Sequence, residues 1–255
     1  MVARVARALV FYAALVGVWQ ALAVFGPWPS YLFPSPRSVL RSLWVDLQAG
    51  VLLEATAMSL RRLAVGYLMA SGLGSVIGAA TATWRWARDT VGSLVLGLQS
   101  LPSITWLPLA VLWFGLSERA IMFVTVMGSL FAISISIRSG VETVPPVLKR
   151  AALTLGARPW QLLLHVVLPA IIPSVMQGLK LGWSFAWRSL MAGELLVVSM
   201  SLGHLLNVGR DLNDVSRVAA VMLVIVAVGI TVDRLLFGQA ERVVRERWGL
   251  EEAAG

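Results

Sequence analysis

The stretch Lys149-Arg150-Ala151-Ala152-Leu153-Thr154-Leu155-Gly156-Ala157, followed by Val166-Val167-Leu168-Pro169, decides how this chain is interpreted. It lies in a polar, helix-forming region, residues 139–170, between long apolar stretches. Polar helices between two membrane spans need a role that explains their presence. A docking surface for another protein is the first role to consider.

The composition is that of a membrane protein. The chain has 255 residues, of which 58% are hydrophobic and 13% charged, and its mean hydropathy is +0.81. Soluble domains carry about a quarter charged residues. We therefore expect one membrane-embedded domain, residues 1–255. The absence of cysteine excludes disulfides and thiolate metal sites. The net charge of +8 comes from basic residues placed between apolar runs, which indicates membrane orientation and no nucleic-acid partner.

Apolar stretches long enough to cross a bilayer recur along the chain and predict an all-α protein with six transmembrane helices. They are residues 6–25, 62–83, 90–114, 119–138, 171–198 and 216–237. Pro102 and Pro108 interrupt the third stretch, so we expect that helix to be kinked or broken inside the bundle. The first stretch follows a basic start as in a signal peptide, but Gly26-Pro27-Trp28-Pro29 is a poor cleavage site. A retained first span is expected.

The basic residues in the loops and at the ends of the spans predict the orientation. With the N-terminus inside, twelve lie inside: Arg4, Arg7, Arg85, Arg88, Arg138, Lys149, Arg150, Arg158, Arg234, Arg242, Arg245 and Arg247. Seven lie outside: Arg37, Arg41, Arg61, Arg62, Arg119, Arg210 and Arg217. Both termini and the region 139–170 are therefore expected in the cytoplasm.

The second span carries a small residue at every fourth position, namely Gly66, Ala70, Gly74, Gly78 and Ala82. Such a series forms a flat strip on one helix face and lets another backbone approach closely. It predicts tight helix packing and no chemistry.

The polar region divides into two short helices. Val144-Pro145-Pro146 breaks the chain after the fourth span, and residues 147–155 then form a helix that Gly156 ends. Arg158-Pro159 marks a turn before a second short helix, residues 160–167.

Two further prolines mark where the fifth span begins. Pro169 and Pro173 are expected in its first turn, where proline is well tolerated.

At these residues the chain resembles the permease subunits of binding-protein-dependent ABC importers. Their signature is Glu-Ala-Ala, three residues, Gly, nine residues, Ile, one residue and Leu-Pro. Arg150-Ala151-Ala152, Gly156, Val166 and Leu168-Pro169 keep this spacing, with Arg150 in place of glutamate and Val166 in place of isoleucine.

The resemblance covers residues 59–237. Its flanking blocks are similar to the subgroup that imports sulfonates, taurine, nitrate or related small molecules. These blocks are Ser59-Leu60-Arg61-Arg62, Leu101-Pro102-Ser103-Ile104-Thr105-Trp106-Leu107-Pro108-Leu109-Ala110 and Leu112-Trp113-Phe114-Gly115.

The resemblance implies a cytoplasmic coupling helix that sits in a cleft of an ATPase subunit. The residues it assigns to this helix are Leu148, Arg150, Ala151, Ala152, Leu153, Leu155, Gly156, Ala157 and Arg158. It also implies two ATPase subunits, a periplasmic or lipid-anchored solute-binding protein and a second permease chain, either identical in a homodimer or merely related. The location it implies is the bacterial cytoplasmic (inner) membrane.

The sequence carries no phosphate-binding loop of the form Gly-x-x-x-x-Gly-Lys-Ser/Thr. We therefore expect a transport subunit that is not an enzyme and has no cofactor of its own, with ATP bound by the partner subunit.

Ionisable groups inside spans suggest function because they are costly there. The fifth span holds Lys180, Arg188 and Glu194, and the last two are expected to find partners on other helices. Arg188 could lie beside the path of an anionic solute, or could serve a structural ion pair. The candidate pathway residues are Gln99, Ser103, Thr105, Arg188 and Glu194. The polar residues around the proline break could equally cap broken helices.

Two other functions remain open at this point. An ion-coupled secondary transporter would use Glu194 and Arg188. An intramembrane hydrolase would need a serine beside a histidine, such as Ser129 with His204, but their spacing does not favour it. The sequence does not name the solute.

Overall fold

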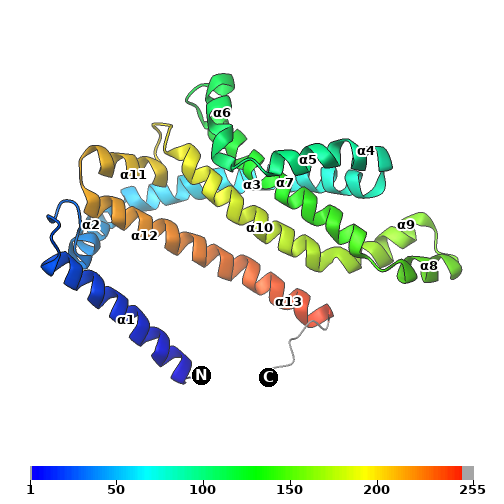
Figure 1. The fold of residues 1–255 in the computed structure, drawn as a ribbon, viewed down its shortest axis with the longest axis horizontal. Helices are drawn as coiled ribbons and strands as arrows, with labels where there is room; N and C mark the ends of the chain where they lie inside the picture. The colour runs from blue at the N-terminus through cyan, green and yellow to red at the C-terminus, as the bar shows by residue number, and fades with distance from the viewer. Residues whose placement is uncertain (1, 249–255) are drawn as a thin grey trace. The chain divides into compact units, whose positions relative to one another are not determined.

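The apolar stretches form helices in the computed structural model, which describes residues 2–248. Within that range every regular element is helical, which confirms the all-α prediction. The elements, shown in Figure 1, are α1 (Val2–Phe25), α2 (Pro36–Gln48), α3 (Val51–Thr83), α4 (Arg85–Asp89), α5 (Val91–Gln99), η1 (Ser103–Thr105), α6 (Trp106–Phe114), α7 (Glu118–Thr143), α8 (Pro146–Thr154), α9 (Pro159–Leu162), η2 (Leu163–Val167), α10 (Leu168–Glu194), α11 (Leu202–Asp211), α12 (Val215–Val232), η3 (Asp233–Phe237) and α13 (Gly238–Trp248).

The number of spans is tested by helix length and hydropathy. Among the described residues, four continuous helices are long and apolar enough to cross a membrane: Val51–Thr83, Glu118–Thr143, Pro159–Glu194 and Val215–Trp248. A bent pair of helices raises the number to five. The apolar part of α1, Leu9–Phe25, is shorter than any of these four helices. Six spans are therefore not confirmed, and that number stays a prediction.

The expected break in the third apolar stretch is confirmed. The helices Arg85–Gln99 and Ser103–Phe114 meet at an angle of 97° (Figure 1). Small polar side chains satisfy carbonyls at the bend: the Ser100 hydroxyl donates to the Gly97 carbonyl at 2.7 Å, and the Thr105 hydroxyl to the Pro102 carbonyl at 2.6 Å. These bonds replace the helical ones that the break removes.

The described residues divide into two compact units, and the expectation of one domain stays a prediction. One unit holds the chain up to Ser59 together with Val198–Ala227. In it, the Arg217 guanidinium lies 2.9 Å from the Asp46 carboxylate. The Ser59 hydroxyl accepts from the Leu202 amide at 3.0 Å, so it satisfies an N–H group in the first turn of α11.

The other unit holds Leu60–Val197 and the chain from Val228 onward. Its centre is the pair α7 and α10, which lie side by side along most of their length (Figure 1). The buried half of α7 also packs on α3. This unit contains both candidate sites.

The small residues of α3 act as predicted. A Cβ on Gly74 would lie 2.8 Å from the Leu130 carbonyl oxygen, and one on Gly78 would lie 2.7 Å from the Ser134 carbonyl oxygen. Only hydrogen fits at these positions, so the backbones of α3 and α7 touch.

Candidate functional site

The residues around Gly156 in the sequence motif form a short, capped helix. Pro146 is the first residue of α8, a position that needs no backbone N–H. At the other end Gly156 has φ +82°, a left-handed conformation that favours glycine. The Gly156 amide donates to the Leu153 carbonyl and the Ala157 amide to the Ala152 carbonyl, each at 3.0 Å. This pair of bonds is the Schellman motif, and it ends α8 sharply.

The base of this segment is packed. Val144, Val167 and Ile171 form a buried cluster between the end of α7 and the start of α10. The Lys149 ammonium of α8 donates to the Val141 carbonyl of α7 at 3.4 Å. The helix is therefore anchored to the spans on both sides.

Beyond this base, α8 presents apolar side chains that the chain itself does not cover. Leu148 is 47% exposed, Leu153 53% and Leu155 88%. Arg150, Ala151 and Gly156 are also exposed, while Ala152 and Ala157 are half-buried. Exposed apolar side chains that lie together are typical of a surface that binds another protein, and α8 has such a surface.

We define the coupling segment as residues 146–158. Arg158 is exposed and precedes α9, and its amide donates to the Gln161 side chain at 2.8 Å. In Figure 1, α8 and α9 lie past the end of α7. All nine residues predicted for docking lie in this segment.

The second part of the polar region differs from the prediction. Residues 160–167 do not form a separate short helix, because α9, η2 and α10 run on as one helix from Pro159 to Glu194. The widened π turn η2 lies directly before Pro169, and the Leu168 amide donates to the Leu163 carbonyl. A proline ring clashes with the carbonyl of the preceding helical turn, and a local widening is one way to accommodate it. Pro173 lies inside α10 and not in the first turn of a new helix.

Three of the predicted pathway residues line one cavity. Gln99 and Ser103, on either side of the break, and Arg188 of α10 border a cavity of about 290 Å³. Aromatic walls are supplied by Phe131 and Phe185. Gln99 and Ser103 are half-buried and Arg188 is exposed. A guanidinium, an amide and a hydroxyl in one cavity can hold a small anion through charge-assisted hydrogen bonds.

The contacts of Arg188 differ from the expectation of a partner on another helix. Its Nε donates to the Ser184 carbonyl of the same helix at 3.0 Å. Its guanidinium carbon also lies 4.9 Å from the centre of the Phe185 ring. A backbone carbonyl and an aromatic ring of its own helix therefore orient the guanidinium.

Thr105 and Glu194 do not line this cavity. Thr105 is exposed beyond the break. Glu194 is fully buried, and its carboxylate lies 3.3 Å from the Arg62 guanidinium, which confirms that it pairs with another helix. The same guanidinium lies 2.7 Å from Glu118. Three helices, α3, α7 and α10, thus meet at one arginine.

The sequence analysis missed this ion network because Arg62 was assigned to an external loop. The helix α3 begins at Val51, well before the predicted start of the span at residue 62. Arg62 is therefore inside a helix and only 6% exposed. The signal that could have drawn attention to Arg62 is its place in the block Ser59-Leu60-Arg61-Arg62, which is similar to the importer subgroup.

Taken together, long apolar helices around a broken span and an exposed, anchored helix between two of them define a polytopic transport protein. Residues 70–245 match the model of the binding-protein-dependent transport system inner membrane component, and the chain belongs to this family. It is therefore a membrane-spanning permease component of an ABC importer.

Individual relatives agree with this assignment. A protein of Methanocaldococcus jannaschii named as an ABC transporter permease is 34% identical over 227 residues, which cover 87% of this chain and 85% of the relative. The protein of Escherichia coli named as the aliphatic sulfonates transport permease SsuC is 27% identical over 210 residues, covering 82% of this chain and 80% of SsuC.

A solved structure supports the fold. A chain from the crystal structure of an amino acid ABC transporter with histidines aligns with a TM-score of 0.60 at 17% identity, covering 80% of this chain and 97% of that one. Family membership decides against an ion-coupled secondary transporter and against an intramembrane hydrolase.

Proposed function

We propose that this chain forms the translocation pathway for a small anionic solute of the sulfonate type, and that α8 is the helix through which ATPase subunits drive it. The observation that carries the proposal is the coupling segment: an apolar, exposed helix, capped by Gly156 and anchored by the cluster around Val144. The chain itself holds no phosphate-binding loop, so ATP is bound and hydrolysed by the partner.

The geometry suits the transmission of force. Because α8 is joined at one end to α7 and contacts η2, which runs on into α10, a push on α8 reaches both of these spans. Closure of two ATPases on ATP would move two coupling segments together and open the pathway to the outside. Their separation would return the pathway to the inside. Such movement is rigid-body displacement of packed helices.

We further propose a homodimer with two ATPases on the cytoplasmic side and a periplasmic or lipid-anchored solute-binding protein outside. Both termini and the coupling segment then lie in the cytoplasm, as the excess of basic residues favours. Arg150 stands where the family signature has glutamate, so a carboxylate on the ATPase is the contact expected for it.

The class of solute is proposed from the cavity and from one relative. SsuC is named for aliphatic sulfonates, and Arg188 brings a positive charge to a cavity that Gln99 and Ser103 also line. An exposed guanidinium within a span is costly against lipid. Because Arg188 is exposed in the single chain, we expect it to face a water-filled path between two copies of the chain.

Reconstitution tests the proposal. The chain is placed in liposomes with the ATPase and solute-binding protein that co-purify with it, and uptake of taurine and methanesulfonate is measured with and without ATP. We expect ATP-dependent uptake that Gly156→Val abolishes, while the amount of inserted chain is unchanged. Gly72→Val is the control, because Gly72 also has open space around it but has no left-handed backbone.

Two results would contradict the proposal. One is uptake by this chain alone, driven by an ion gradient. The other is a Gly156→Val complex that hydrolyses ATP and transports as well as the wild type.

The role of Arg188 is tested in the same liposomes. Arg188→Ala is expected to lower uptake of both sulfonates far more than it lowers the amount of inserted chain. Arg119→Ala removes a charge from another exposed arginine and is expected to change neither. Equal losses of uptake and insertion in Arg188→Ala would assign Arg188 to structure.

A further inference from the structure

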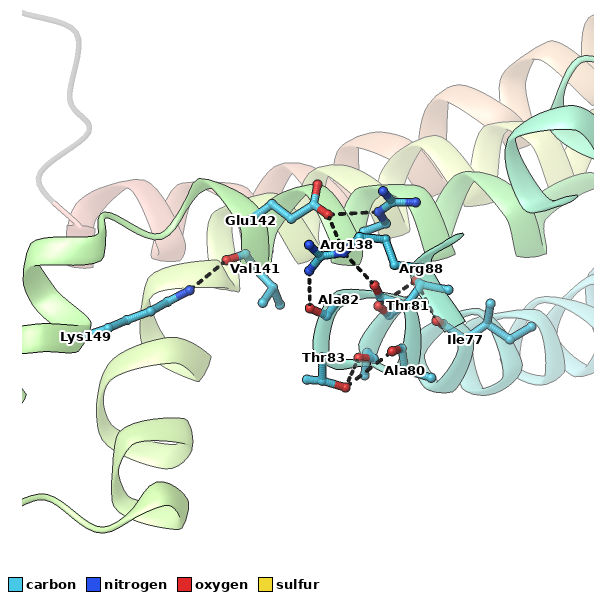
Figure 2. Close-up of polar contacts among 12 residues, drawn as sticks. Ile77, Ala80, Thr81, Ala82, Thr83, Arg88, Arg138, Val141, Glu142 and Lys149 are labelled. Carbon is cyan, nitrogen blue, oxygen red and sulfur yellow. Dashed lines mark hydrogen bonds and ion pairs between the residues drawn. The ribbon is translucent and has the colours of Figure 1, made fainter. Parts of the chain in front are cut away.

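The end of α3 is closed by an arginine from the next helix. The Arg88 guanidinium donates to the Ala82 carbonyl at 2.8 Å and to the Thr81 carbonyl at 3.4 Å (Figure 2). These carbonyls lie in the last turn of α3 and lack helical partners. A cation is favoured at this end of a helix, so Arg88 is fixed to α3.

The same guanidinium is fixed to α7. Arg88 Nε lies 3.5 Å from the Glu142 carboxylate, which also accepts from Arg138 Nε at 3.0 Å. Figure 2 shows the Glu142 carboxylate shared between the two arginines. We call Arg88, Arg138 and Glu142 the Arg88 cluster. Arg138 is 22% exposed, whereas Arg88 and Glu142 are 39% and 40% exposed, so solvent screens the cluster in part.

The cluster is built into the neighbouring helices. It borders a cavity of about 190 Å³ together with Thr81 and Gly92. A Cβ on Gly92 would lie 2.5 Å from a guanidinium nitrogen of Arg138, so this glycine makes room for the arginine.

The cluster lies directly next to the contact that holds α8. Lys149 of α8 donates to the carbonyl of Val141, the residue before Glu142 (Figure 2). Polar contacts from α8 and from the end of α3 therefore reach adjacent residues of α7, and the rigid helix backbone joins them.

At the opposite end of α7, Arg62 of α3 pairs with Glu118. Between that pair and the Arg88 cluster, small residues make the contact between α3 and α7. The two helices meet through small residues such as Gly74 and Gly78, whose lack of side chains allows close approach but no interlocking. Packed helices with such faces can slide along each other. A charged link at one end resists sliding where the small residues do not.

We propose that Arg88 and Glu142 are positioning residues that carry the movement of α8 to α3 during transport. The proposal rests on the coupling role proposed above for α8. Without this link, α3 would be tied to α7 and α10 by ion pairs only at the Arg62 end, and its Arg88 end could lag behind α8. With it, α3 is held at both ends and the three spans move as one body.

The absence of cysteine allows a direct test, because a single Thr83→Cys introduces one site for a spin label at the exposed end of α3. The complex with its co-purified ATPase is placed in liposomes. The spectrum of the label is recorded without nucleotide and with ATP plus vanadate, and ATP hydrolysis is measured in parallel. In the unaltered background we expect ATP plus vanadate to change the spectrum.

Arg88→Ala and Glu142→Gln are then added to this background. Each is expected to abolish the spectral change at residue 83 while ATP hydrolysis continues. Glu142→Gln leaves the Arg88 cap on α3 in place, so it tests the link even if Arg88→Ala fails to insert. Arg85→Ala is the matched control: it removes the same charge from an exposed position of the same short helix and is expected to leave the spectral change intact.

Four results would overturn the proposal. A full spectral change in Glu142→Gln would show that α3 follows α8 without the cluster. Loss of ATP hydrolysis in Glu142→Gln would place the cluster in docking instead. A loss in Arg85→Ala equal to that in Arg88→Ala would show a general charge effect. A background complex that hydrolyses ATP without any spectral change would also refute it. By contrast, failure of any ATPase to bind the unaltered chain would refute the proposed function itself.

Discussion

The two ends of α7 are held in opposite ways. At its C-terminal end the chain passes into α8, whose shape depends on hydrogen bonds between residues a few positions apart, as at Gly156. At its N-terminal end Glu118 meets Arg62, 56 residues away, and Arg62 meets Glu194, 132 residues away. The helix α8 that follows one end is exposed and locally determined. At the other end Arg62 and Glu194 are buried, Glu118 is exposed, and the ion network exists only because three helices pack together.

Because of this difference, we expect mutations at the two ends to affect different properties, stability at one and function at the other. Changes in the buried network should lower stability whatever the partner. Changes in the coupling segment should spare stability and alter the response to the ATPase. The following predictions separate the two ends.

The largest effect is expected from Arg62→Ala. It leaves the fully buried Glu194 without this guanidinium, and removing one partner of a buried ion pair costs about 3–5 kcal/mol. Thermal unfolding of the purified chain in detergent should show a clear drop in midpoint. Arg61→Ala, at the exposed neighbouring position, is the control and should unfold like the wild type. Equal midpoints for both variants would show that the network contributes nothing.

A smaller loss is expected from Gly78→Val in the packed middle of the same unit. The added side chain would meet the Ser134 carbonyl and Ile137, so α3 must move away from α7. Overpacking of this kind costs about 1–3 kcal/mol. Gly72→Val, which meets open space on the same helix, should leave the unfolding midpoint unchanged. If Gly78→Val and Gly72→Val unfolded at the same midpoint, α3 and α7 would not be in contact at Gly78.

Gly156→Ala should have a local effect of about 1–2 kcal/mol, the cost of a side chain in the left-handed region. There is open space around this position, so the cost comes from the backbone alone. Hydrogen exchange of the amides of residues 156 and 157 should accelerate about tenfold, which corresponds to about 1.4 kcal/mol. The global unfolding midpoint should stay within error. Unchanged exchange would show that the cap does not hold α8.

The smallest effect on stability is expected from Leu155→Ser. This side chain is 88% exposed, and surface changes of this kind usually stay within about 0.5 kcal/mol. Binding of the co-purified ATPase, measured by retention on the immobilised chain, should nevertheless fall. Retention equal to that of the wild type would remove Leu155 from the docking surface.

The coupling segment could be predicted almost completely from the sequence. Pro146 and Gly156 fix the ends of α8 through local backbone preferences, and these preferences do not depend on the rest of the chain. The same holds for the break at Pro102. The second part of the polar region was predicted wrongly, because a widened turn let one helix continue through Pro169 and Pro173.

Part of the pathway prediction also depended on folding. Gln99, Ser103 and Arg188 were chosen because polar side chains inside spans are costly, and they line one cavity. Thr105 and Glu194 were chosen by the same rule but lie elsewhere. The rule identifies unusual side chains and does not assign their partners.

The sequence by itself determined the helical class, the membrane environment, the capped helix between two spans and the family signature, because each follows from composition or from contacts within a few residues. Only the tertiary structure decided that Arg62 joins Glu118 to Glu194 and that Arg88 joins the end of α3 to Glu142. The physical reason is the range of the interactions. Ion pairs between distant helices form only after those helices pack, and nothing in the local sequence specifies which charges will meet.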